Sequence, residues 1–225
     1  MTVLLVLITF SAFLLIDYFR TRHATTQPAL QAYETKVEEA PRLKPALVGG
    51  FEVPENLRYH PGHTWALREG HCLVRVGMDD FASKLTGTVD SIALPTRGTW
   101  IRQGQKLCTI HRDGATVDMV SPIEGTVADI NEAITQNPKL ALSDPYGEGW
   151  LLAVQAPDVK ISFRNLLGGA LARWWTEESA SRLQRRMPMA VAGAYAQDGG
   201  VAVDNISAHI PDAEWVPLAK EFFLS

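Results

Sequence analysis

Apolar residues dominate the start of the chain. Residues 2–16 carry no charged side chain, and Asp17-Tyr-Phe19 extends this run to about 20 residues, which is the length that crosses a bilayer. No positive segment precedes the run and no small-residue cleavage site follows it, so we expect a retained transmembrane helix over 1–19. Arg20 and Arg22 then place the N-terminus outside and the bulk of the chain in the cytoplasm, as a single-pass protein of a bacterial-type inner (cytoplasmic) membrane. A buried amphipathic helix and a signal peptide are the alternatives.

Residues 20–56 lack a long apolar pattern. Prolines at positions 28, 41, 45 and 54 interrupt any long helix, and charges of both signs are interleaved. We expect a partly extended linker, which either holds the following domain away from the bilayer or lies along a partner subunit.

Short apolar runs between glycine and proline turn signals fill the middle of the chain and predict a mainly β domain over 57–160. Short helices are expected at Phe81–Leu85 and at Asn131–Pro138, where the residue before the proline ends the helix. Asp113-Gly114 suits a type I′ turn and predicts a hairpin. The expected strands are Trp65–Leu67, His71–Gly77, Thr88–Ala93, Lys106–His111, Thr116–Val120, Gly125–Ile130 and Trp150–Ala156.

Residues 161–188 predict an amphipathic helix that ends at Pro188. Its five arginines and the pair Trp174 and Trp175 suit a cytoplasmic membrane surface, and packing on the β domain is the equal alternative. The apolar positions recur at a helical spacing of three or four and are expected on one face: Phe163, Leu166, Leu167, Ala170, Leu171 and Trp174.

Residues 189–225 are acidic, and Gly199-Gly200 loosens their middle. Trp215, Phe222 and Phe223 nevertheless make this tail too apolar for a disordered segment. We expect a C-terminal docking tail of two short amphipathic helices, which pack on this protein or on a partner.

The composition excludes one class of partner. The 225 residues include 21 lysines and arginines against 25 aspartates and glutamates, so the net charge is −4, without a basic patch. No nucleic-acid partner is expected. Cys72 and Cys108 agree with a reducing compartment or are small buried residues, and they do not decide the topology.

No combination of side chains indicates catalysis. Asp113 and Asp118 have no partner group that would make an acid–base pair, and the chain has no nucleophile elbow, phosphate loop or dinucleotide motif. We therefore predict no enzyme activity, no metal, no cofactor and no small-molecule substrate. Metal-type side chains occur without the short paired spacing of a metal site, at His60, His63, His71, Cys108 and His111.

Longer stretches of sequence fall in a fixed order: Tyr59-His-Pro-Gly-His-Thr-Trp65, Val76-Gly-Met-Asp-Asp-Phe-Ala82, Gly98-Thr-Trp-Ile-Arg-Gln-Gly104 and Asp144-Pro-Tyr-Gly-Glu-Gly-Trp150. They resemble the H protein of the glycine cleavage system, a small lipoyl-domain carrier. The resemblance covers residues 57–160 and implies a barrel-sandwich hybrid fold, in which His63 and Trp65 fix the first strand.

The lysine that carries lipoic acid in this family has no counterpart in the sequence. In the family it stands in a Glu-Ser-Val-Lys-Ala word and takes the acyl group in amide linkage. Alignment on Ser121-Pro122 and Gly125 places Gly114 at that position, and no lysine occurs from 107 to 138. The resemblance therefore implies a degenerate, membrane-anchored member without a lipoyl group. The nearest lysines are expected to be solvated surface residues: Lys84, Lys106 and Lys139.

Two functions remain open. The first is a non-catalytic membrane-anchored subunit or assembly factor of a cytoplasm-facing membrane complex, a redox complex being one candidate, whose partners are integral membrane subunits and the bilayer through residues 1–19. The second is a membrane-tethered lipoyl carrier modified at an unexpected lysine. Membrane-fusion proteins of export pumps, a third lipoyl-like class, insert a helical hairpin for which 106–126 has no room. The candidate partner-binding residues are Arg112, Asp113, Trp174, Trp175, Trp215, Phe222 and Phe223.

Overall fold

The computed structural model describes residues 45–187, 196–197, 201–202 and 204–224. The expected transmembrane helix over 1–19 lies outside these residues, as does most of the expected linker. Within the described part, no helix combines the length and the apolar character needed to cross a bilayer.

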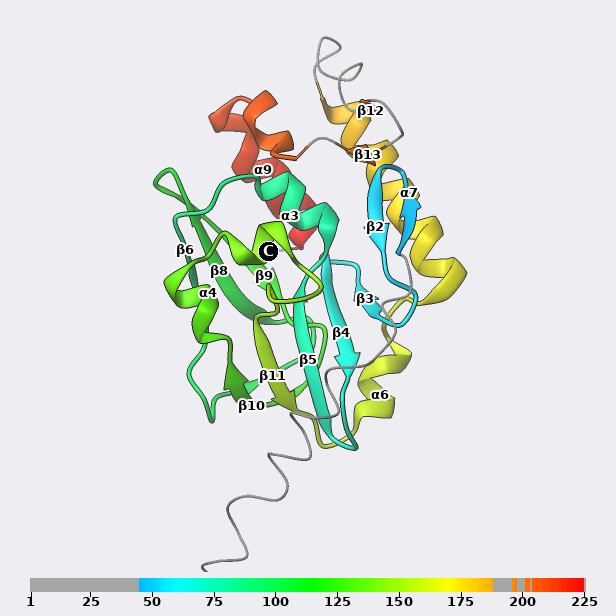
Figure 1. Cartoon of the computed structure of the whole chain (residues 1–225), viewed down its shortest axis with the longest axis vertical. Coiled ribbons are helices and arrows are strands. Elements are labelled where there is room, and N and C mark those ends of the chain that lie inside the picture. The colour runs from blue at the N-terminus through cyan, green and yellow to red at the C-terminus, as the bar shows by residue number, and fades with distance from the viewer. Residues whose placement is uncertain (1–44, 188–195, 198–200, 203, 225) are drawn as a thin grey trace, which may run out of the picture. The chain divides into compact units, whose positions relative to one another are not determined.

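Two antiparallel sheets form the central domain (Figure 1). The smaller sheet has the order β6-β8-β9, with β6 (Ser91–Ala93), β8 (Lys106–Arg112) and β9 (Ala115–Val120). The larger sheet has the order β3-β4-β5-β11-β10-β7. Its strands are β3 (Arg58–His60), β4 (Thr64–Arg68), β5 (Leu73–Met78), β11 (Leu152–Gln155), β10 (Gly125–Ile130) and β7 (Trp100–Ile101).

The core lies between these sheets, because each strand turns alternate apolar side chains inward. Val74 and Val76 of β5 belong to the same buried cluster as Ile110 of β8 and Met119 of β9, and all four side chains are fully buried. The seven strands expected from the sequence are present within a few residues of their expected bounds. The prediction of a mainly β domain followed by C-terminal helices is confirmed.

Helices close the ends of this domain. α3 (Asp80–Thr86) begins where the Asp79 side chain accepts a hydrogen bond from the backbone N–H of Ala82, as an N-cap does. α4 (Glu132–Gln136) begins after the Asn131 cap and ends before Pro138, as expected from the sequence. The short helix α5 (Leu140–Ser143) follows directly.

The expected linker over 20–56 is wrong in its last part, which forms a hairpin. β1 (Ala46–Val48) pairs with β2 (Phe51–Val53) through the two-residue turn Gly49-Gly50. Both glycines have positive φ, 57° and 90°, as a type I′ turn requires. Phe51 is fully buried against Phe81, so this hairpin belongs to the domain.

The single helix expected over 161–188 is divided in two. α6 (Val159–Arg164) is separated from α7 (Gly169–Arg186) because Leu167 exchanges two backbone hydrogen bonds with Tyr59, of 2.8 and 2.9 Å, which draws the connection into extended conformation. Residues before and after the break therefore do not share one helical face. α7 buries Ala172, Trp175, Ser179 and Leu183, whereas Leu171 and Trp174 of the expected apolar face are exposed.

The C-terminal tail packs on the domain. Two short helices were expected here, and the tail contains a short 3-10 helix, η1 (Ile206–His209), and the α-helix α9 (Asp212–Phe223). The short strands β12 (Ala196–Gln197) and β13 (Val201–Ala202) pair before them. α9 lies against β9 and α3 (Figure 1).

The turn between β3 and β4 contains two buried or half-buried histidines. The Nδ1 atom of His60 accepts a hydrogen bond of 3.0 Å from the backbone N–H of Gly62, so that nitrogen must be unprotonated. Burial lowers the pKa of His60 below its ordinary value of 6.5, and the neighbouring His63 lowers it further. Protonation of His60 therefore opposes this turn.

We predict that the protein loses stability as the pH falls through about 6.5, because the unfolded chain then binds a proton that His60 in the folded chain does not. The free energy of unfolding should fall between about pH 8 and about pH 5, and less so in His60→Gln, whose side-chain oxygen can still accept the Gly62 bond. Urea titrations at each pH measure this difference. His71→Gln, at an exposed position, is the control; an identical pH profile for wild type and His60→Gln would contradict the prediction.

Candidate functional site

The hairpin of β8 and β9 ends in the two-residue turn predicted from the sequence. Arg112 pairs with Ala115, and Asp113 and Gly114 between them have positive φ values of 48° and 79°, which define a type I′ turn. The Asp113 N–H donates a 2.7 Å hydrogen bond to the carboxylate of Asp90, which holds the tip against the segment before β6. A side chain at Gly114 would meet no atom within 4 Å, so the tip projects freely.

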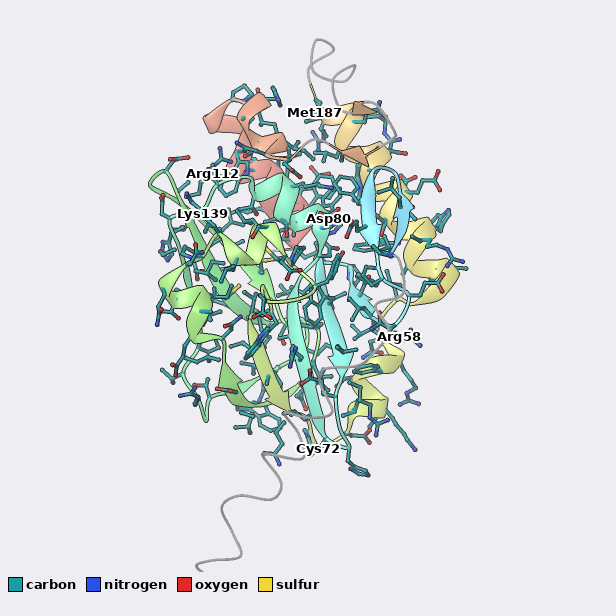
Figure 2. All side chains as sticks on the ribbon, in the orientation of Figure 1. Arg58, Cys72, Asp80, Arg112, Lys139 and Met187 are labelled. Atoms are coloured by element: carbon teal, nitrogen blue, oxygen red, sulfur yellow. The ribbon has the colours of Figure 1, made fainter. Side chains whose placement is uncertain are left out.

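Arg112, expected as part of an exposed tip, is buried, with 7% of its surface exposed. Its guanidinium lies 4.8 Å from the centre of the Trp215 ring, and its Nε donates to the Asp113 carboxylate at 3.2 Å. Figure 2 shows Arg112 beside α9. Cation–π stacking on a tryptophan from the tail therefore removes this arginine from the surface.

The tail covers the side of the domain next to the hairpin. The indole N–H of Trp215 donates a 3.0 Å hydrogen bond to the carbonyl of Leu85, at the end of α3. The ring of Phe222 lies 5.0 Å from that of Phe81, and Phe223 is fully buried. Of the two expected arrangements, docking on this protein or on a partner, the described residues show the first.

The seven candidate partner-binding residues are thus divided by exposure. Trp175 lies on the buried side of α7 and is 9% exposed. Trp215, Phe222 and Phe223 are 2% exposed or less. These four residues and Arg112 are buried by contacts within the domain itself, so their apolar or charged side chains do not need a partner protein to cover them. Trp174, 64% exposed, and Asp113, whose side chain is 68% exposed, face solvent.

The nearest lysines do not replace the missing one at the tip. Lys106 begins β8 opposite Val120, at the end of the hairpin away from the turn, and its amine pairs with Asp118 at 2.9 Å. Lys139 is exposed, directly before α5, and does not belong to the hairpin. Lys84 is buried, with 8% of its surface exposed, so the expectation of a solvated lysine is wrong there.

A buried polar cluster explains the position of Lys84. Its amine pairs with Asp80 at 2.9 Å, and the same carboxylate oxygen accepts the backbone N–H of Glu52 on β2 at 2.8 Å. Burial raises the pKa of Asp80 above its ordinary value, and Lys84 opposes that rise. These partners satisfy the lysine charge inside the domain, as a buried charge requires.

His63 belongs to a second buried polar group, at the start of α3. Its Nδ1–H donates to the Asp79 carboxylate at 2.8 Å, and its ring stacks on Phe81 at 4.0 Å and lies 4.5 Å from Trp175. Trp65, 1% exposed, donates its indole N–H to the carbonyl of Pro145. Both residues are thus buried and hydrogen-bonded at the start of β4, the position in which the sequence analysis expected them to fix a strand.

The described residues offer no obvious reactive centre. No three histidine, cysteine, aspartate or glutamate side chains of this part of the chain gather as metal ligands would. Burial raises the pKa of the Cys108 thiol to about 12, so this cysteine stays protonated and unreactive near neutral pH.

Two antiparallel sheets with a projecting β-hairpin define a lipoyl-type domain of the H-protein kind. The family model of the glycine cleavage H-protein matches residues 57–173, which is half of the chain. The chain belongs to the glycine cleavage H-protein family. Nearly all of α7's buried side, and the whole of α9, lie outside the matched segment.

The comparisons with individual proteins agree. The glycine cleavage system H protein of Anaeromyxobacter sp. strain K is 33% identical over 128 residues, which cover 57% of this chain and 98% of that protein. The corresponding protein of Mycobacterium avium strain 104 is 37% identical over 107 residues, covering 48% and 81%. The crystal structure of a glycine cleavage system H protein from Mycobacterium marinum has 25% identity and a TM-score of 0.48, over 56% of this chain and 98% of that one.

The residues at the hairpin tip do not fit a lipoyl group. Amide linkage needs a side-chain amine at the tip, and the tip consists of Asp113 and Gly114. The Lys84 amine is held in a buried ion pair, and Lys106 lies at the other end of the hairpin. The sequence showed that the tip has no amine. It did not show that Asp90 holds the tip, because the hydrogen bond from Asp113 to Asp90 joins residues that are distant in the chain.

We predict that Trp215→Ala lowers the free energy of unfolding by about 3 to 5 kcal/mol, since it removes a buried aromatic ring and its hydrogen bond. Hydrogen exchange should rise in α9 and at Arg112, which loses its stacking partner. Urea unfolding of the full chain in detergent and exchange by mass spectrometry measure the two effects. Trp174→Ala is the matched control on an exposed helix face and should change stability by about 0.5 kcal/mol or less. Equal losses in the two variants would contradict the docking described here.

Proposed function

We propose that this chain is a non-catalytic, membrane-anchored member of the H-protein family that acts as a protein-interaction module. It would serve as a subunit or assembly factor of a cytoplasm-facing membrane complex, a redox complex being one candidate. The observation that carries the proposal is the hairpin tip, where Gly114 in a type I′ turn stands at the position of the family's lysine and provides no group for acyl attachment.

The surface beside the tip supports the same proposal. A carrier presents its arm from a tip that partner enzymes approach, whereas here α9 lies against β9 and stacks Trp215 on Arg112. The face next to the tip is therefore occupied by the chain's own tail. A rigid, covered domain suits permanent assembly better than repeated delivery to several enzymes.

The sequence supplies the membrane part of the proposal. The apolar run over 1–19 would anchor the chain as a single span, and Arg20 and Arg22 would keep the domain on the cytoplasmic side of a bacterial-type inner membrane. Its partners would then be integral membrane subunits, with neither nucleic acid nor a small-molecule substrate.

The alternative is a membrane-tethered lipoyl carrier modified at an unexpected lysine. Lys106 and Lys139 are the exposed lysines nearest to the hairpin tip in sequence, so they would be the positions to consider. Neither lies at a projecting turn of the hairpin, and Lys106 is held by Asp118. The geometry therefore favours the interaction module.

We predict that the tagged full chain, isolated from gently solubilised native membranes, brings with it a fixed set of membrane proteins at constant ratio. Mass spectrometry of the isolated material identifies and quantifies them. If the exposed tip contributes to this assembly, Asp113→Asn should reduce the captured amount, since it removes the charge and keeps a residue that tolerates positive φ.

Glu148→Gln, at an exposed position near α5, is the control for loss of one acidic charge. Recovery of the chain alone, or with soluble glycine-cleavage enzymes, would contradict the proposal and favour the tethered carrier.

A further inference from the structure

Exposed apolar side chains occur on the two helices along one side of the domain. Among the described residues, six large apolar side chains are exposed: Leu47, Trp100, Ile161, Leu171, Trp174 and Leu224. Three of them lie on the consecutive helices α6 and α7, with 53%, 55% and 64% of their surface exposed, and we name Ile161, Leu171 and Trp174 the α6–α7 face. These two helices follow each other along one side of the sheets (Figure 1).

The domain itself does not need these side chains. α7 is held by its opposite face, where Ala172, Trp175 and Leu183 are buried. Leu171 and Trp174, three residues apart, point together to the other side of the same helix. Single exposed apolar residues are normal, but neighbouring ones on an outer helix face indicate contact with another surface.

The chemistry of the face suits a lipid surface. Tryptophan is favoured at the boundary between lipid and water, because its ring is apolar and its N–H is polar. Lys160 and Arg164, on α6 with Ile161, are exposed cations that suit anionic headgroups. An apolar helix edge with cations beside it is the pattern of a helix that lies on a bilayer.

The described part of the chain begins next to α7. The described residues begin at Pro45 and enter β1, which packs against α7: a Cβ atom at Gly49 would lie 2.7 Å from the Cβ of Ala180. The segment that would connect the domain to the proposed span at 1–19 therefore joins the domain beside α7. Tethering next to a bilayer raises the effective concentration of lipid at that side.

From these observations we propose that the α6–α7 face rests on the cytoplasmic bilayer surface, with Leu171 and Trp174 at the level of the headgroups. This inference rests on the membrane anchoring in the proposed function. It assigns an orientation to the domain, because the helices would face the lipid and the other sides of the sheets would face the cytoplasm.

The test places a nitroxide at Trp174→Cys in the full chain, reconstituted in nanodiscs of phosphatidylethanolamine and phosphatidylglycerol. Cys72→Ser removes the half-buried cysteine, and Cys108 stays because it is 1% exposed. Trp100→Cys, a tryptophan site on β7 with 50% exposure, is the matched control. Power saturation compares collision with oxygen, which dissolves in lipid, and with a water-soluble nickel complex. We expect the ratio of oxygen collision to nickel-complex collision to be several-fold higher at position 174 than at position 100.

Equal ratios at both positions, in discs that retain the protein, would overturn the surface contact and leave the anchoring intact. Protection of position 174 in native membranes but not in pure lipid discs would also overturn it, because a partner protein would then cover the face. A chain that alkaline carbonate extracts from native membranes would instead refute the anchor itself. The two proposals therefore fail by different observations.

Discussion

The indole of Trp215 joins three parts of the molecule that are distant in sequence. Its N–H donates to the Leu85 carbonyl at the end of α3, and its ring packs against the Arg112 guanidinium beside the hairpin turn. Phe222 and Phe223 fix the other end of the same helix against the core. The ring contributes buried apolar area and a hydrogen-bonded N–H, so α9 is part of the domain. The hairpin is therefore contacted by a helix that lies outside the segment matched by the family model.

The hairpin turn and the C-terminal tail lie next to each other in the domain. At the tip, φ is positive at both Asp113 and Gly114, a turn that favours short residues and glycine over a long side chain. Beside the tip, the arginine that would otherwise be exposed is stacked on the tail. The tail thus covers the hairpin at Arg112, whereas Asp113 and Gly114 at its tip are exposed.

The sequence predicted the features that depend on local patterns and missed those that depend on distant contacts. The Asp113-Gly114 turn and the strands around it follow from β-branched runs and turn residues, and both are present. Gly49-Gly50 carries the same turn signal between apolar residues, yet β1 and β2 were assigned to a linker. The break between α6 and α7 was not visible, because it depends on the bonds of Leu167 to Tyr59, and it rotates Trp174 outward. Likewise, the burial of Lys84 depends on the packing of β2 against α3, which the local sequence pattern does not indicate.

Lipoylation of the native protein is the most direct measurement of the central claim, that this H-protein domain carries no acyl group. The chain would be purified from its own membranes, and its mass and every lysine-containing peptide would be measured by mass spectrometry. Gly114→Lys serves as the positive control for the cell's lipoyl-attachment enzymes, because its Cβ would meet no atom within 4 Å, although the positive φ strains any side chain there. The account predicts an unmodified wild-type chain. A lipoyl group on Lys106, Lys139 or any other lysine of the native protein would contradict it.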